Sequence, residues 1–302
     1  MNQTIWLTGS RGFIGGYLLK ELESAGHEVN CFTNQRSFEE DVICLNYNDR
    51  EQINLAVKKY GVPNTFVHLG WGNVYLPHHS DHISTNLQSG KNLINELYES
   101  GLERFILIGS SSEYGEKVGK LSEVVCNPDE SINKYVKGKI ILSNYGLEVA
   151  KKFKKSFIHV RLFYTYGAGQ KHNSLINQIH KSYLSGESIN LSPCLQYRDY
   201  IHAYDASIGI KKLCYSDYRG IVNLGSGEII QLKSFIEKLW NEYGQPREKL
   251  KFGQHSQPDY EQVQPKAYAD LKQIIKLTNW QPSIDINKGI KITVSNLLEQ
   301  QI

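Results

Sequence analysis

Short apolar runs alternate with amphipathic stretches through the first half of the chain. The apolar runs occupy residues 3–8, 28–33, 41–45, 65–69, 104–109 and 156–162, and their composition predicts strands. Apolar residues recur at helical spacing between these runs, notably over residues 85–100 and 131–153. Because strands that alternate with helices form a parallel sheet covered on both faces, the pattern predicts an α/β, doubly wound, Rossmann-like fold.

The regular alternation weakens after Gly167. Shorter segments interrupted by Gly, Ser and Pro follow, and residues 228–302 combine helices with irregular stretches. We therefore expect residues 1–168 to form the coenzyme-binding Rossmann domain and residues 169–302 to form a smaller C-terminal substrate lobe.

Composition excludes several classes of protein. With 40% hydrophobic and 22% charged residues among 302, the chain has a globular composition, and no apolar run approaches the roughly 18 residues of a membrane span. The N-terminus enters a strand directly, without the pattern of a signal peptide. Five scattered cysteines without a CxxC pair argue against a disulfide framework or a zinc site, and we expect a cytoplasmic protein. The net charge of +3 and the basic run 151–155 do not indicate nucleic-acid binding.

Three glycines follow the first predicted strand. Gly9, Gly12 and Gly15 stand at GxxGxxG spacing before a helical pattern. Gly9 would permit a tight turn, Gly12 a close approach to a pyrophosphate, and Gly15 close packing of the helix on the strand. Glycines also mark ordinary turns, but the strand and helix around this motif favour a dinucleotide site.

Residues suited to proton transfer occur at the carboxyl end of the strand 104–109 and in the helix 131–153. The strand ends in the hydroxyl-rich segment 109–115, which either binds a ligand or caps a turn. Tyr135 and Lys139 stand four apart and so share one helix face. A free phenol has a pKa near 10, and we expect the lysine ammonium to lower it by stabilising the phenolate.

These motifs together resemble the extended short-chain dehydrogenase/reductase family of nucleotide-sugar epimerases, dehydratases and reductases. The resemblance runs nearly end to end, through residues 8–15, 67–69, 86, 110, 135–139, 161–167, 198–202, 223–227, 269–270 and 279–282. It selects Ser110, four positions before Tyr114, as the hydroxyl that holds the substrate oxygen. It implies that Tyr135 is the acid or base, that Lys139 also binds the nicotinamide ribose, and that residues 199–226 return to the main sheet.

The resemblance and the motifs also assign binding residues. Those expected to contact the coenzyme are Gly9, Arg11, Gly12, Phe13, Ile14, Gly15, Thr33, Asn34, Arg36, Asn46, Leu69, Gly70, Tyr135 and Lys139. Those expected to contact the substrate are Trp71, Ser111, Ser112, Asn173, Arg198 and Tyr260. Arg198 equally suits an ion pair with Asp199. No metal is expected, and His172 and His202 are assigned to structure or substrate positioning.

The second predicted strand indicates which coenzyme is bound. It ends in residues 33–36 without the acid that would accept hydrogen bonds from the ribose of NAD. Arg11 resembles an arginine that relatives preferring NADP hold against the 2′-phosphate, and Arg36 could complete the clamp. Both could instead be solvated surface charges. NADP(H) is therefore favoured, with NAD(H) possible.

The residues that follow Ser110 limit which of the family's reactions the chain could catalyse. Ser111 and Ser112 stand where dehydratases of the family carry an Asp-Glu pair, and Ser112 stands where epimerising reductases carry a cysteine. Residues 69–72 resemble a subset of deoxysugar 4-reductases. The favoured activity is NADPH-dependent reduction of the C4 keto group of a nucleoside-diphospho-4-keto-6-deoxysugar, with Tyr135 donating the proton. The alternatives are an NAD-dependent nucleotide-sugar 4-epimerase and a non-catalytic NADP-binding sensor.

The resemblance also predicts the assembly. Helices over residues 85–100 and 131–153 pair in relatives as a four-helix bundle, so a homodimer is expected. Neither nucleic acid nor membrane is an expected partner. The sugar, its nucleoside carrier and the stereochemistry of the product stay open at this point.

Overall fold

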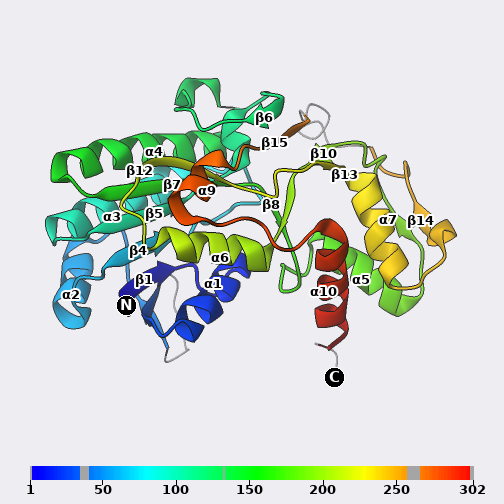
Figure 1. The fold of residues 1–302 in the computed structure, drawn as a ribbon, viewed down its shortest axis with the longest axis horizontal. Helices are drawn as coiled ribbons and strands as arrows, with labels where there is room; N and C mark the ends of the chain where they lie inside the picture. Colours follow the sequence, from blue (N-terminus) through cyan, green and yellow to red (C-terminus); the bar gives the residue numbers. More distant parts are fainter. Residues whose placement is uncertain (1, 35–40, 132, 257–265, 300–302) are drawn as a thin grey trace.

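A parallel sheet of seven strands forms the middle layer of one half of the molecule, on the left in Figure 1. The computed structural model describes residues 2–34, 41–131, 133–256 and 266–299. Across the sheet the strands run in the order β12 (Arg219–Leu224), β7 (Ser156–Leu162), β5 (Arg104–Ile108), β4 (Thr65–His68), β1 (Thr4–Thr8), β2 (Glu28–Thr33) and β3 (Val42–Cys44). The doubly wound, Rossmann-like fold predicted from the alternating pattern is confirmed.

Helices cover both faces of this sheet, because successive strand residues point to opposite sides. Ile5 and Leu7 of β1 join a core cluster with α1 and α6, whereas Trp6 joins a second cluster with α2, α3 and α4. The first face carries α1 (Phe13–Ser24), α6 (Ala203–Leu213) and α9 (Lys272–Thr278). The second carries α2 (Arg50–Tyr60), η1 (His82–Leu87), α3 (Gln88–Glu99) and α4 (Lys134–Phe153).

The helix that carries Tyr135 and Lys139 has clear physical boundaries. Asn133 caps its start by accepting the Val136 N–H at 2.9 Å. Lys154 ends it in the left-handed conformation, with φ of 56°. The other expected helix, over residues 85–100, is found as α3, Gln88–Glu99, and residues 85–87 belong instead to the π-helical turn η1, which runs directly into α3. The sequence pattern therefore located both helices but missed the irregular turn.

The C-terminal half builds a second core beside the sheet. α5 (Leu175–Ser185), α7 (Leu232–Glu242) and α10 (Ile286–Glu299) pack around Tyr166 and Trp240, at the end of the molecule away from α2 and α3 (Figure 1). Two-stranded sheets accompany them: β8 (Tyr164–Tyr166) with β11 (Tyr200–His202), β10 (Tyr197–Arg198) with β13 (Ile230–Gln231), β9 (Ile189–Asn190) with β14 (Leu250–Lys251), and β6 (Gly119–Leu121) with β15 (Ala267–Ala269). Short 3-10 turns complete the chain: η2 (Ser111–Tyr114), η3 (Pro128–Glu130) and η4 (Arg247–Lys249).

The chain crosses between the two cores more than once. Within residues 199–226, α6 packs on α1 and β12 joins the main sheet, whereas β11 pairs with β8. Later in the chain, α9 packs against α6 and β12. The division into a coenzyme-binding domain and a substrate lobe at residue 168 stays a prediction.

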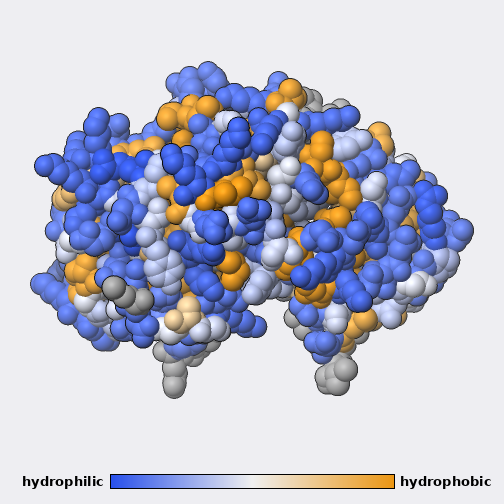
Figure 2. All heavy atoms as spheres, viewed as in Figure 1, coloured by the Kyte–Doolittle hydropathy of each residue, from blue (hydrophilic) through white to orange (hydrophobic). Residues whose placement is uncertain are grey.

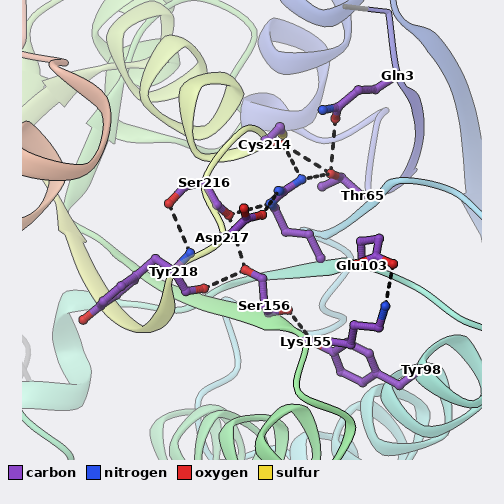
Figure 3. A network of polar contacts seen from close by, with 11 residues as sticks. Gln3, Thr65, Tyr98, Glu103, Lys155, Ser156, Cys214, Ser216, Asp217 and Tyr218 are labelled. Atoms are coloured by element: carbon purple, nitrogen blue, oxygen red, sulfur yellow. Dashed lines mark hydrogen bonds and ion pairs between the residues drawn. The ribbon is translucent and has the colours of Figure 1, made fainter.

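A buried arginine ties the amino ends of the strands together. Arg104 begins β5 and donates to the Thr65 hydroxyl at 3.0 Å, to the Cys214 carbonyl at 2.6 Å and to the Asp217 carboxylate at 2.6 Å. It also donates to the Ser216 carbonyl at 2.5 Å. Figure 3 shows these acceptors around one point between β4 and the loop that follows α6. The network anchors that loop to the sheet edge opposite the glycine turn.

Hydrophilic residues predominate on the face drawn in Figure 2, and hydrophobic ones show among them in separate groups. No helix in the described part of the chain is long and apolar enough to cross a membrane.

Candidate active site

A cleft of about 680 Å³ opens at the carboxyl ends of β1 and β4. The strand order reverses between these two strands, and open α/β sheets bind ligands at such a point. The cleft is lined by Gly9, Ser10, Arg11, Gly12, Phe32, Thr33, Asn34, Tyr47, His68, Gly70, Trp71, Gly72, Asn73, Asp81, Thr85, Asn86 and Ser89.

The glycine turn fits a pyrophosphate. Gly9 has φ of +75°, and a Cβ there would lie 2.9 Å from the Gly70 nitrogen. A Cβ on Gly15 would lie 2.0 Å from the Gly9 carbonyl oxygen, so only glycine lets α1 start this close to β1. Gly12 caps α1 with no side chain over the first turn. The exposed amides and the helix dipole at this end favour an anion, which is what a dinucleotide brings.

The end of β2 also lines the cleft. Thr33 and Asn34 are among the lining residues, and so is Arg11 of the glycine turn. These positions carry no carboxylate for a ribose diol, and Arg11 supplies a cation that suits a phosphate. Arg36, the other expected cation, lies outside the described residues.

Several expected coenzyme contacts do not line the cleft. Phe13 packs edge-on against Tyr17, whereas Ile14 and Leu69 pack against the core beneath. Gly15 acts through its packing on Gly9. Asn46 is exposed, and its side chain accepts the Asn48 N–H at 3.0 Å.

The structure brings the three expected catalytic side chains together. Ser110 lies between β5 and η2, and its hydroxyl forms a side-chain hydrogen bond with the Tyr135 phenol. Lys139 lies one turn further along α4, with its Nζ 5.8 Å from the centre of the Tyr135 ring. None of the three is among the residues that line the cleft, but Trp71, which lines it, contacts both Tyr135 and Lys139.

The pKa of Tyr135 moves in the direction opposite to the expected one. Burial of the phenol and the charge of Glu113 raise its pKa to about 12, although the hydrogen bond from Ser110 lowers it. The expected lowering of this pKa is wrong for this structure, because desolvation of the phenol outweighs the hydrogen bond from Ser110, and Lys139 is not among the groups that shift it. Tyr135 therefore stays protonated at neutral pH, as a proton donor must.

The pKa of Lys139 is perturbed strongly. The side chain is 4% exposed, and burial lowers its pKa to about 7 against the opposing charge of Glu113. Its Nζ donates to the Ile108 carbonyl at 2.6 Å. An ammonium has three donor hydrogens, so Lys139 is able to bind a ribose hydroxyl while keeping this bond.

A buried carboxylate beneath Ser110 was missed by the sequence analysis. Glu113 accepts the Ser110 N–H at 2.8 Å and also binds His159 at 2.7 Å and Arg161 at 2.9 Å. Burial favours its neutral form, but His159 and Arg161 outweigh this and hold the pKa of Glu113 at about 2. The spacing of Ser110 and Glu113 is that of a capping box, which was the available signal.

The expected substrate residues are scattered around this centre. Ser111 and Ser112 are half-buried in η2, and Asn173 is exposed. Arg198 is buried with its guanidinium 4.4 Å from the centre of the Tyr164 ring, and Tyr260 lies outside the described residues. Tyr164 was also missed by the sequence analysis, yet it lies close enough to contribute to the raised pKa of Tyr135.

The alternative of an ion pair between Arg198 and Asp199 is not what the described residues show. Asp199 accepts hydrogen bonds from Ser226, Gly227 and Ala269 and none from Arg198. Arg198 instead donates to the Tyr197 carbonyl at 3.2 Å and lies over the Tyr164 ring. No group of three or more His, Cys, Asp or Glu side chains among the described residues is placed to hold a metal ion. His202 is buried and caps α6 through the Tyr204 N–H, whereas His172 is exposed.

Comparison with known proteins matches this geometry. The model of the NAD-dependent epimerase/dehydratase family matches residues 5–225. The chain belongs to this family. The family match confirms the resemblance to the extended short-chain dehydrogenase/reductases and the expectation of an NAD(P)-dependent enzyme of the oxidoreductase type.

Individual family members differ in their reactions. The chain is 25% identical to dTDP-6-deoxy-L-talose 4-dehydrogenase (NAD(+)) of Aggregatibacter actinomycetemcomitans, over 79% of this chain and 90% of that one. Two solved structures share the fold with a TM-score of 0.83 each: UDP-glucose 4-epimerase of Thermotoga maritima with UDP-glucose (18% identity, covering 99% of this chain and 100% of that one), and RMD from Pseudomonas aeruginosa with NADPH (19%, 100% of both). The Thermotoga structure thus contains UDP-glucose, the Pseudomonas structure contains NADPH, and the dehydrogenase is named for NAD(+).

Proposed function

We propose that the protein reduces the C4 keto group of a nucleoside-diphospho-4-keto-6-deoxysugar with NADPH. The observation that carries the proposal is the Tyr135 phenol, which has its pKa raised to about 12 and is hydrogen-bonded to Ser110. A donor that stays protonated at neutral pH suits reduction, in which the substrate oxygen gains charge and then a proton.

Ser110, Tyr135 and Lys139 have different roles in this reaction. The coenzyme supplies the hydride when it is bound. Ser110 and Tyr135 hydrogen-bond the substrate oxygen, and Tyr135 transfers its phenolic proton to that oxygen as negative charge develops there. The Lys139 ammonium stabilises the phenolate that results, until solvent returns a proton to Tyr135.

Two features support NADPH over NADH. The described end of β2 lacks a carboxylate in the cleft, and Arg11 faces the same cleft from the glycine turn. A 2′-phosphate needs such a cation, whereas the ribose diol of NAD needs an acceptor. The dehydrogenase relative is named for NAD(+), so a direct comparison of NADPH with NADH in binding and turnover is required.

The residues in η2 disfavour both elimination of water and reduction that is coupled to epimerisation. Ser111 and Ser112 offer hydroxyls where water loss needs a carboxylic acid and a carboxylate. The similarity to a UDP-glucose 4-epimerase keeps 4-epimerisation as the second candidate. An epimerase returns the hydride to the same sugar and consumes no coenzyme, which separates the two activities. A non-catalytic sensor would have no use for a proton donor held beside Ser110.

The proposal is tested by an NADPH oxidation assay across dTDP-, UDP-, GDP- and CDP-linked 4-keto-6-deoxysugars. We expect stoichiometric NADPH consumption with at least one of them and a 4-hydroxy product. Interconversion of C4 epimers by the purified protein with no added coenzyme would contradict the proposal and favour the epimerase.

We further propose that Arg198 and Tyr164 contact the substrate. We also propose that α3 and α4, which pack side by side, form a four-helix homodimer interface with a second copy of the chain. Light scattering after size-exclusion chromatography tests the dimer. The five cysteines are free, which suits a reducing compartment such as the cytoplasm.

A further inference from the structure

The ammonium of Lys139 rests on the face of an indole beside the coenzyme cleft. Its Nζ lies 4.1 Å from the centre of the Trp71 ring. Among the described residues no carboxylate lies within ion-pair distance of it, and the Ile108 carbonyl accepts one of its hydrogens. A buried cation needs compensation, and here a carbonyl and a π face provide it at close range.

A buried histidine sets the orientation of that indole. Trp71 Nε1 donates to His82 Nδ1 at 2.9 Å, and His82 Nε2 donates to the Leu76 carbonyl at 2.9 Å, an arrangement that requires the neutral Nε2–H tautomer. Asn86 binds both backbone polar groups of Gly72, the residue after Trp71. Its Oδ1 accepts the Gly72 N–H at 3.1 Å, and its Nδ2 donates to the Gly72 carbonyl at 3.0 Å. The indole is thereby fixed at its ring nitrogen and at its backbone.

The same pair of rings packs closely against α4. Trp71 and His82 meet the Tyr135 ring edge to face, with centroids 6.4 Å and 5.4 Å away. The Tyr135 N–H donates to the Pro77 carbonyl at 2.9 Å. A Cβ on Gly138 would lie 2.7 Å from the His82 carbonyl oxygen and 3.2 Å from Trp71 Cζ2. Only glycine at position 138 permits this approach.

We propose that Trp71 and His82 are positioning residues that keep the Lys139 ammonium charged and in place beside Tyr135, so that Trp71 serves proton transfer rather than recognition of the sugar. The inference deepens the proposed function for the catalytic step. It replaces the sequence-based assignment of Trp71 as a substrate contact. His82 acts through Trp71, because its Nδ1 is the acceptor that aims the indole.

The proposal predicts a pH dependence with a definite sign. Burial lowers the pKa of Lys139, whereas the Trp71 face favours the charged form, so loss of the indole should lower that pKa further. The reaction needs the charged form of Lys139. In such a variant, the loss of activity that accompanies rising pH should therefore begin at a lower pH. The other titratable groups that face Lys139 are Tyr135, Glu113, His68, His82 and His159.

A first test needs neither substrate nor coenzyme. The emission of Trp71 is isolated by subtracting the Trp71→Phe spectrum from that of the unmodified protein, and it is followed from pH 5 to pH 10. We expect a transition near pH 7 that is absent in Lys139→Met and lost or strongly reduced in His82→Phe, which keeps a ring but no acceptor for the indole. Emission that titrates identically in the Lys139→Met variant would overturn the inference whatever reaction the enzyme catalyses.

A second test uses the pH profile of turnover. Trp71→Leu removes the π face, and Trp71→Phe retains one. We expect the alkaline limb of kcat to move down by about one pH unit in Trp71→Leu and by much less in Trp71→Phe, with KM for the nucleotide sugar unchanged in both. An increase in KM with the alkaline limb unmoved would return Trp71 to the substrate site and contradict the proposal.

Discussion

Replacing Glu113 by Gln removes one buried negative charge and little volume. The carboxylate has a pKa of about 2 in the folded protein against an ordinary value of 4.5, because His159 and Arg161 outweigh its burial. A folded pKa below the unfolded one contributes stability above pH 4.5 that is lost as the pH falls toward 2. The difference corresponds to about 3 kcal/mol at pH 7, falling to about 1 kcal/mol at pH 3.

Urea unfolding of the unmodified protein and the Glu113→Gln variant at pH 7, 4 and 3 measures this contribution. We expect the variant to be less stable by about 3 kcal/mol at pH 7, and the two proteins to converge as Glu113 becomes protonated. A pH-independent difference, or one below about 1 kcal/mol at pH 7, would refute the assignment of Glu113 as the charged anchor of Ser110.

Three further predictions concern other parts of the molecule. Gly15→Ala should weaken coenzyme binding at least tenfold in a fluorescence titration, because its Cβ would meet the Gly9 carbonyl oxygen at 2.0 Å. The control Gly16→Ala, with its nearest contact at 3.8 Å, should bind the coenzyme normally. Arg104→Met should lower the free energy of unfolding by about 3 kcal/mol, since it leaves the buried Thr65 hydroxyl and Cys214 carbonyl without their donor. Arg219→Met at an exposed site should cost less than about 1 kcal/mol, and equal losses in urea unfolding would count against the network. Arg11→Gln should raise the Kd for NADPH about tenfold and leave that for NADH unchanged, and an equal effect on both coenzymes would remove Arg11 from the phosphate site.

Much of the central sheet could be predicted from local pattern alone. Strands at 28–33 and 156–162 were predicted with the bounds that the structure shows, because short β-rich runs that alternate with helical segments fit a parallel sheet. The glycine turn was also predictable, since each glycine answers a local steric need.

The surroundings of the catalytic groups could not be predicted in the same way. Glu113 belongs to a residue type that is almost always exposed, and its partners His159 and Arg161 lie on β7, far along the chain. The pKa of Tyr135 depends on how tightly neighbouring elements enclose the phenol, which one helix pattern does not contain. The spacing of Tyr135 and Lys139 thus predicted their proximity but not the direction of the pKa shift.

The central claim is that Tyr135 donates the proton that completes hydride transfer. It is tested most directly by single-turnover reduction of the best 4-keto substrate by NADPH-loaded enzyme, comparing the unmodified protein with Tyr135→Phe. The account predicts at least a hundredfold slower turnover with unchanged NADPH affinity, since the phenylalanine ring preserves packing but carries no proton. Turnover within a few-fold of the unmodified rate would contradict it.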